Sequence, residues 1–394
     1  MKISIFSDLH LGFASNTPLE QDSFDNAEQA LRQSLDSDLI LICGDLFDEK
    51  FPKPDEILKA IKIFSLAKKA KGARILEGIN KDLPEIQGIP IVALHGTHER
   101  WSGRPNAVQL LESAGLLIHL HKNGVILECN GIKVAVQGMS GVPERFAAQI
   151  MEDWSPKPIK DCYNILLLHQ TIHPFVYSPL EMPTLSIDNL PDGFDLIING
   201  HIHKSMFEKI GDKRILFPGS TIVTQLKEEE QSEKVIYKLL LPEDELISEP
   251  IKNVRKFFFE RVEIKEGESI REKITNVLDK YKGEYFKKPL IKLKIKCHKF
   301  VNVDKEMRSI AKSYDDFIIK YSKELASEEV KEKIHVLREA REKKSSIGET
   351  GIKILEENLK SNNFSKDIDF LKLFEYLSEA NFESAKKLLL GDEK

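Results

Sequence analysis

The sequence has no long apolar run and few cysteines, and each absence excludes a class of protein. None of its apolar runs approaches the roughly 20 residues that a membrane-spanning helix requires. The first residues, MKISIFSDLH, contain only a short strand-like stretch, so we expect neither a signal peptide nor a transmembrane segment. The four cysteines are widely spread and form no Cys-x-x-Cys pair: Cys43, Cys129, Cys162 and Cys297. Such thiols are expected to stay reduced, which favours a cytosolic location.

What the sequence does contain is an uneven distribution of charge. Its 394 residues, enough for two or three domains, carry a net charge of −5. Residues 1–250 have 25 Lys and Arg against 36 Asp and Glu, whereas residues 251–300 have 15 against 7. A basic block beside an acidic region suggests that one part holds a polyanion and another processes it. A solvated lysine-rich surface explains the block equally well, because solvated lysines and phosphate contacts look alike in sequence.

Short apolar runs alternate with helix-like stretches through residue 240, which predicts an α/β domain with a large mixed sheet system. Strands are expected at 2–6, 38–43, 89–94, 132–137, 164–168, 195–199 and 235–240. Helices are expected at 54–70, where Pro54 suits a first turn, and at 105–114. The stretch LPEDELISEP, residues 241–250, is interpreted as a linker.

A second set of elements follows this linker. Residues 251–326 indicate a βαβαβ unit, in the segments RKFFFERVEI, ESIREKITNVLDKY, PLIKLKIK, DKEMRSIAKS and DFIIKYS. A charged helix is expected at 327–344, then the flexible stretch KKSSIGETG, then a pair of helices at about 351–391. The expected divisions are a domain at 1–245, a basic domain at 251–326, a helix and linker at 327–350 and a helical pair at 351–394.

Residue types that bind metals stand directly after five of the expected strands. They are Asp8 and His10, then Asp45 and Asp48, then His95, Thr97, His98 and Glu99, then His169, then His201 and His203. Strands that end together bring their loops together, and active sites collect at such sheet edges. A single Asp-x-His pair or strand-end histidine is more often a chance or structural feature. Five such groups in order favour a shared function.

Imidazole and carboxylate ligands together indicate manganese, iron or zinc. Two ions about 3.5–4 Å apart form the usual clamp for in-line displacement at phosphorus. A shared carboxylate is needed to hold two cations that close, and Asp45 suits this role because it stands on a tight Gly-Asp turn at a strand end. Five other histidines match no motif and are expected to be structural or surface residues: His119, His121, His173, His298 and His335.

The ordered motifs DLH, GDLFD, GTHE, the histidine of LLLHQ, and GHIH resemble those of the calcineurin-like metallophosphoesterase superfamily over roughly residues 1–240. The resemblance implies a two-sheet β-sandwich flanked by helices, with two metals at one edge. Within the superfamily, SDLHLG, GDLFD, LLLHQ, NGHIHK and LFPGS are most similar to the nuclease subunit of the double-strand-break repair complex, of the Mre-eleven type in archaea and eukaryotes and SbcD-like in bacteria. The unit at 251–326 resembles that family's DNA-capping domain. The terminal helices resemble its docking segment for a Rad-fifty-type ATPase.

The resemblance also implies a role for each motif residue. One divalent ion, expected to be Mn²⁺, would be held by Asp8, His10, Asp45 and His203. A second would be held by Asp45, Thr97, His169 and His201. His98 would ligate neither ion and would steady charge at phosphorus or protonate the leaving oxygen.

Three positions depart from the family pattern. Thr97 replaces an asparagine that offers a carbonyl oxygen on a longer arm, so the second metal site is expected to be weakened but not lost. Asp48 stands where many archaeal and eukaryotic relatives have histidine and the bacterial type has aspartate; a turn or capping role and a functional role are equally open. His95, where the pattern usually has a small residue, either contacts substrate or lines the loop.

Periodicity predicts two interaction surfaces. Alternation with period two places Lys292, Lys294 and Lys296 on one face of a strand, which suits contact with a DNA backbone. In the terminal pair, an apolar stripe suits docking into a groove at the coiled-coil base of the ATPase; it includes Leu371, Phe374 and Leu377. The resemblance implies a homodimer through helices near 54–70 and 105–114, although an apolar stripe such as that of Leu58 and Ile61 is more often ordinary core.

Together these features predict a DNA repair nuclease that uses two divalent metals and processes double-strand breaks with an ABC-type ATPase. We expect an exonuclease, with endonuclease activity left open, acting on DNA ends in the cytoplasm at the nucleoid. Two other classes stay open. A phosphatase or phosphodiesterase for small-molecule or protein substrates would share the metal site but would not need the basic unit. A weakly catalytic DNA-end scaffold has Thr97 as its only support in the sequence.

Overall fold

The computed structural model describes residues 1–100, 104–175, 185–265, 267–297 and 303–325, together with residues 386 and 388. Met1–Ile295 and Asn302–Lys323 form one compact unit, which contains nearly all of these residues. Lys296–Val301 and Glu324–Lys394 form a second unit, most of which lies outside the described residues. Within the described part of the chain, no helix is long and apolar enough to cross a membrane.

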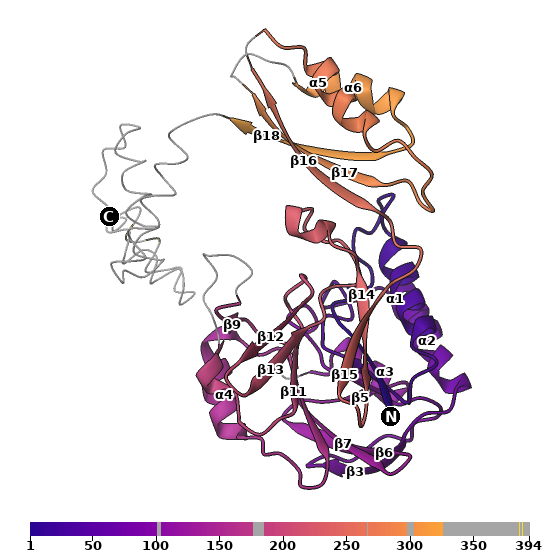
Figure 1. Cartoon of the computed structure of the whole chain (residues 1–394), viewed down its shortest axis with the longest axis vertical. Coiled ribbons are helices and arrows are strands. Elements are labelled where there is room, and N and C mark those ends of the chain that lie inside the picture. Colours follow the sequence, from indigo (N-terminus) through magenta and orange to yellow (C-terminus); the bar gives the residue numbers. More distant parts are fainter. Residues whose placement is uncertain are drawn as a thin grey trace. The chain divides into compact units, whose positions relative to one another are not determined.

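One of two large sheets has six strands (Figure 1). Their order is β15 (Glu245–Pro250), β14 (Val235–Leu240), β1 (Lys2–Phe6), β2 (Leu39–Ile42), β4 (Ile91–Ala93) and β5 (Ile118–His119). Strands β1, β2, β4 and β5 run parallel, and β14 pairs antiparallel with β1. The carboxyl ends of β1, β2 and β4 therefore lie at one edge of this sheet.

The other large sheet has seven strands. Their order is β12 (Met206–Ile210), β13 (Lys213–Phe217), β11 (Leu196–Asn199), β8 (Tyr163–Leu168), β7 (Ile132–Met139), β6 (Asn123–Cys129) and β3 (Arg74–Ile79). Strands β7, β8, β11 and β13 run parallel, so the carboxyl ends of β8 and β11 also share an edge.

Alternation along each strand builds the layers. In β2, Leu39 and Leu41 pack into a core that also contains Val134 and Leu216 of the other sheet. The intervening Ile40 packs outward, against helices α1 (Asp22–Gln33), α2 (Pro54–Phe64) and α3 (Ala107–Ser113). Helix α4 (Ala147–Trp154) packs on the outer face of the seven-stranded sheet. The expected two-sheet sandwich flanked by helices is therefore confirmed.

A smaller three-stranded sheet follows in sequence, in the order β16-β17-β18. The chain runs through β16 (Phe257–Ile264), α5 (Ile270–Asp279), β17 (Leu290–Cys297), α6 (Val303–Ser313) and β18 (Ile318–Leu325). This is the βαβαβ order expected for residues 251–326. The helix expected at 327–344 lies outside the described residues, as does the pair expected at 351–391 except for residues 386 and 388.

The interpretation of residues 241–250 as a linker is wrong. Residues 245–250 form β15, which pairs antiparallel with β14 in the register Leu240↔Glu245 to Val235↔Pro250. Glu245 and Glu249 interrupt the apolar pattern of β15, and none of the six residues of this edge strand is fully buried. The chain leaves the sheet at Ile251, and residues 251–256 lead to β16.

Candidate metal centre

Loops that follow β1, β2, β4, β8 and β11 carry the strand-end residues singled out in the sequence, and the structure brings them together. Three overlapping groups have ligand atoms within 4.8 Å of one another: Asp8, His10 and His203; His10, Asp45 and His98; Asp45, His169 and His201. Asp45 and His10 each belong to two of these groups. The Asp45 carboxylate thus lies within reach of the ligand atoms of both groups, and its role as a bridge stays a prediction.

The backbone is strained where it delivers these side chains. Four residues of the set have positive φ angles: Asp8 (53°), His10 (45°), Asp45 (46°) and His201 (72°). A left-handed backbone costs of order 1–3 kcal/mol at a residue other than glycine, and such residues cluster at functional sites. The surrounding contacts must offset this cost, which indicates that the loops are held in place for their side chains.

Two glycines allow these loops to approach one another closely. A Cβ atom at Gly44 would lie 2.3 Å from His169 Nδ1, and a Cβ atom at Gly96 would lie 2.0 Å from Asp45 Oδ1. Both distances are far below van der Waals contact. The side chains of His169 and Asp45 therefore occupy space that only glycine leaves open.

Three of the histidines are oriented by a hydrogen bond at the same ring nitrogen, Nδ1. Nδ1 of His10 lies 3.1 Å from an Asp48 carboxylate oxygen, and Nδ1 of His169 lies 2.6 Å from the Cys43 carbonyl oxygen. Nδ1 of His203 lies 2.8 Å from the Thr224 hydroxyl. Because a carboxylate and a carbonyl only accept, Nδ1 carries the proton in the first two rings. Their Nε2 lone pairs are then available to a cation, which is the usual arrangement of metal-ligating histidines.

Two buried polar atoms at this centre, Asp8 Oδ2 and His169 Nε2, have no hydrogen-bond partner among the described residues. The Nε2 atoms of His10 and His203 lie 3.2 Å apart, and His169 Nε2 lies 3.2 Å from Asp45 Oδ2 without hydrogen-bond geometry. Buried polar atoms are ordinarily paired, so exceptions need an explanation. Nitrogen and oxygen ligands that converge in this way fit divalent cations.

The electrostatics of the centre favour positive charge. Burial opposes the charged form of His169, but the Asp45 carboxylate outweighs it and raises the pKa of His169 to about 10. Burial also opposes ionisation of Asp45, yet the neighbouring His169 holds the pKa of that carboxyl well below its ordinary value. A proton on the His169 ring therefore balances the Asp45 carboxylate, and a divalent cation, when bound, would supply that positive charge instead.

The loop after β4 presents Thr97 and His98 at the edge of this set. Within the described residues, the Thr97 hydroxyl has no hydrogen-bond partner, and Thr97 is half-buried. The His98 side chain is 41% exposed, and its Nδ1 donates to the Asp48 carbonyl oxygen. Its backbone N–H donates to Asp45 Oδ1 at 3.0 Å. Solvent can therefore reach the His98 ring, unlike the buried rings of His10 and His169.

Asp48 and Glu99 hold this loop from two sides. Asp48 contacts His10 through its side chain and His98 through its backbone. Glu99 is fully buried and accepts from the backbone N–H groups of Phe47 and Gly96, both at 2.7 Å. Burial, reinforced by Asp45, raises the pKa of Glu99 to about 7. Glu99 thus ties together the loops that follow β2 and β4.

His95 lines the inner side of the loop among other histidines. Its Nδ1 lies 2.8 Å from His119 Nε2, and its ring centroid lies 5.5 Å from that of His121. Burial lowers the pKa of His95 to about 3 and that of His121 to about 4. These neutral rings support the structural interpretation of His119 and His121. His173 is exposed on β9 (Ile172–His173), and His298 and His335 lie outside the described residues.

The basic strand has the alternation expected of it. In β17, Lys292 and Lys294 are half-buried and Lys296 is exposed, whereas Leu293, Ile295 and Cys297 are buried. Burial and the nearby Lys320 of β18 lower the pKa of Lys292, so positive charges gather on this face. The residues expected to bind the ATPase, Leu371, Phe374 and Leu377, lie outside the described part of the chain.

Sequence reasoning missed Thr224, whose hydroxyl contacts His203, and Glu230, whose carboxylate lies 3.9 Å from His203 Nδ1. Both follow the LFPGS segment, but neither stands in a motif or at a strand end. Glu230 belongs to a short 3-10 turn, Glu228–Gln231, within an acidic run that is typical of a solvated surface. The one signal in the sequence that could have pointed to Thr224 and Glu230 was their position shortly after the LFPGS motif.

Comparison with known proteins finds one matching family model and several relatives with similar names. Residues 1–205 match the model of the calcineurin-like phosphoesterase family. The chain is 32% identical to the double-strand break repair protein MRE11 of Encephalitozoon cuniculi, over 70% of this chain and 52% of that protein. It is 27% identical to the double-strand break repair protein mus-23 of Neurospora crassa, over 65% and 40%. It is 28% identical to the DNA double-strand break repair protein Mre11 of Archaeoglobus fulgidus, over 58% and 52%. The chain spans about half the length of the curated relatives it matches.

Proposed function

Because the chain belongs to the calcineurin-like phosphoesterase family, we propose that it is a metal-dependent phosphodiesterase that acts on DNA as a double-strand-break repair nuclease. The observation that carries this proposal is the convergence of carboxylates and oriented histidines at one sheet edge. The relatives named for double-strand break repair support DNA as the substrate. We expect exonuclease activity at DNA ends, with endonuclease activity left open.

In this proposal, the chain holds two divalent cations, with Mn²⁺ as the expected ion. Asp8, His10, Asp45 and His203 would hold one, and Asp45, Thr97, His169 and His201 the other. Such cations, when bound, offset the negative charge that develops at phosphorus and activate water for attack. Hydrogen bonds from Nδ1 to Asp48 and Cys43 keep His10 and His169 in the required tautomer, and the Thr224 hydroxyl holds the orientation of the His203 ring.

His98 is proposed as the catalytic histidine that ligates neither ion. Its Nδ1 donates to the Asp48 carbonyl oxygen, so this contact does not occupy Nε2, and the side chain is 41% exposed. An imidazole placed there can stabilise charge at phosphorus and give a proton to the leaving oxygen. General acid–base catalysis of this kind typically contributes about 10²–10⁴-fold to the rate.

The rest of the chain suits DNA and protein partners. Lys292, Lys294 and Lys296 share one face of β17, where they would contact the phosphate backbone. Leu58 of α2 and Leu110 of α3 are each 52% exposed, which favours a homodimer through these helices. A Rad-fifty-type ATPase is the proposed partner of the C-terminal segment, and the expected location is the cytoplasm, at the nucleoid.

The proposal is tested with the full chain, manganese and duplex DNA with free ends. His98→Ala should keep manganese occupancy and duplex binding but lose about 10²–10⁴-fold of the cleavage rate. Asp45→Ala should instead lower the occupancy of both ions. His173→Ala changes an exposed histidine outside the centre and serves as the matched control, which should cut at the parental rate.

Two results would point elsewhere. Hydrolysis of a nitrophenyl phosphate ester without any cleavage of DNA would assign the centre to a phosphatase. If the protein binds duplex DNA at full manganese occupancy but hydrolyses neither the nitrophenyl ester nor DNA, it is a DNA-end scaffold and not a nuclease.

A further inference from the structure

A buried ion pair lies beside the candidate metal centre. Glu230 and Lys234 each have a side chain only 4% exposed, and Lys234 Nζ lies 3.3 Å from Glu230 Oε2. Lys234 Nζ also donates to Ser220 Oγ at 3.0 Å. A charge is almost never this deeply buried unless it is paired. Stability alone does not explain this ion pair, because two apolar residues of similar size would fill the same space without the cost of removing two charges from water.

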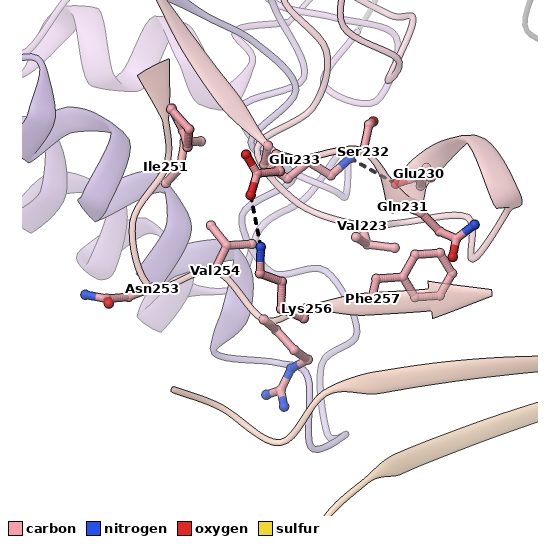
Figure 2. Close-up of a pocket in the computed structure, with 13 residues that line it drawn as sticks. Val223, Glu230, Gln231, Ser232, Glu233, Ile251, Asn253, Val254, Lys256 and Phe257 are labelled. Atoms are coloured by element: carbon pink, nitrogen blue, oxygen red, sulfur yellow. Dashed lines mark hydrogen bonds and ion pairs between the residues drawn. The ribbon is translucent and has the colours of Figure 1, made fainter. Parts of the chain in front are cut away.

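Hydrogen bonds to backbone N–H groups hold the Glu230 carboxylate beside a small cavity. This cavity has a volume of about 130 Å³, and its lining includes Glu230, Lys234 and Ile251 (Figure 2). Glu230 Oε2 accepts from the Thr224 backbone N–H at 3.0 Å, and Oε1 accepts from that of Gln225 at 2.8 Å. One carboxylate thus anchors two consecutive residues of the loop.

The anchored loop reaches the metal centre through one side chain. Thr224 Oγ1 lies 2.8 Å from His203 Nδ1, and Glu230 Oε1 lies 3.9 Å from the same nitrogen. On the other side of the ring, His203 Nε2 faces His10 Nε2 at 3.2 Å and Asp8 Oδ1 at 3.8 Å. The contacts run continuously from Lys234 through Glu230 and Thr224 to a proposed metal ligand.

We propose that Glu230, held by Lys234, is a positioning residue for the metal site that contains His203. By fixing the Thr224 hydroxyl beside Nδ1, it holds the orientation of the His203 ring and directs Nε2 toward His10 and Asp8, which would hold the same cation. The inference rests on the proposed function only in taking His203 as a ligand. Partners of this kind typically change metal affinity about 10- to 100-fold.

Calorimetric titration of manganese into the metal-free full chain tests the inference without relying on catalysis. Glu230→Gln keeps the shape of the side chain but cannot accept both backbone N–H groups while facing Lys234. We expect one manganese-binding event to weaken about 10- to 100-fold and the other to stay at the parental value. Asp22→Asn is the matched control, because it disrupts another buried ion pair, with Arg255, outside the candidate centre. It should lower the melting temperature and leave both binding events unchanged.

A second pair of variants separates positioning from folding. Thr224→Ser keeps the hydroxyl and should bind manganese as the parent does, whereas Thr224→Val keeps the shape without the hydroxyl and should weaken one event. Equal manganese binding by the serine and valine variants would overturn the inference. So would a Glu230→Gln protein that melts at a lower temperature but binds both ions as the parent does. A parent that binds manganese without cutting DNA would contradict the proposed nuclease and leave this inference standing.

Discussion

Thr97 lies in the loop after β4, between two residues whose backbone N–H groups are held by hydrogen bonds. Gly96 N–H donates to Glu99 and His98 N–H donates to Asp45, so the backbone on both sides is fixed. The Thr97 hydroxyl has no hydrogen-bond partner within the described residues. A short hydroxyl in a fixed loop is a weaker oxygen donor than the longer arm of an asparagine.

Thr97→Asn should therefore tighten the weaker of two manganese-binding events and lower the manganese concentration needed for cleavage. The gain comes from a better oxygen donor in a site that otherwise has one carboxylate and two imidazoles. Calorimetric titration of the metal-free chain measures it, with Thr97→Val as the control that removes the oxygen and keeps the shape. If the valine variant binds like the parent, the hydroxyl is not a ligand. Weaker binding by the asparagine variant would mean that the loop is built around threonine.

The residues predicted from the sequence and those found only in the structure reach the candidate metal centre in different ways. Asp8, Asp45 and His169 come directly after apolar strands, so sheet geometry alone places them at one edge. Thr224 contacts His203, and Glu230 contacts the backbone of Thr224, through hydrogen bonds between loop residues, and no periodicity reports such a contact. Asp48 lies between these cases, because its position was visible but its contact with His10 required the fold.

At the scale of elements, strand β17 carries the clearest prediction. Its lysines alternate with Leu293, Ile295 and Cys297, which are buried, so one face is basic along its length. Reversing the charges of Lys292, Lys294 and Lys296 to glutamate should weaken duplex binding. It should also flatten the dependence of log K on log salt, by about 0.9 for each DNA phosphate that the protein no longer neutralises.

Binding isotherms at several salt concentrations measure this slope. Reversal of Lys68, Lys69 and Lys71, exposed lysines near the end of α2, changes the net charge equally and should leave the slope unchanged. Equal effects of the two triple variants would assign β17 to general electrostatics. If neither triple variant changes the slope, the lysines of β17 are solvated surface residues that do not contact DNA.

Elements buried on both faces were the easiest to predict, and edge elements the hardest. Strands β8 and β11 were expected within one residue of where they begin and end, because each is a mostly apolar, buried run between other strands. Strand β15 lies at the edge of its sheet and carries Glu245 and Glu249, so its sequence resembles a linker. The hydrogen bonds of an edge strand come from its neighbour, and sequence periodicity does not record them.

At the scale of the whole molecule, the proposed ATPase contact depends on residues beyond the described sheets. Truncation after Lys344 removes the stretch that contains Leu371, Phe374 and Leu377. We expect the shortened protein to stay folded, to bind manganese as before and to lose co-purification with a Rad-fifty-type ATPase, because a tethered amphipathic pair suits docking into a groove. Melting temperature and metal titration are the controls. A fall of many degrees in the melting temperature would instead place these helices in the protein's own core.

The place of β1 in its sheet has a consequence for synthesis of the protein. Ile3 pairs with Leu39 on one side and with Leu239 on the other, and all three residues belong to the core between the two sheets. At the usual pace of translation, about 5–20 residues per second, the ribosome adds the 200 residues between these partners in roughly 10–40 seconds. During that interval the nascent chain exposes an apolar strand edge without its last partner. The segment 1–205 contains neither β13 nor β14, so released alone it should aggregate or be held by chaperones.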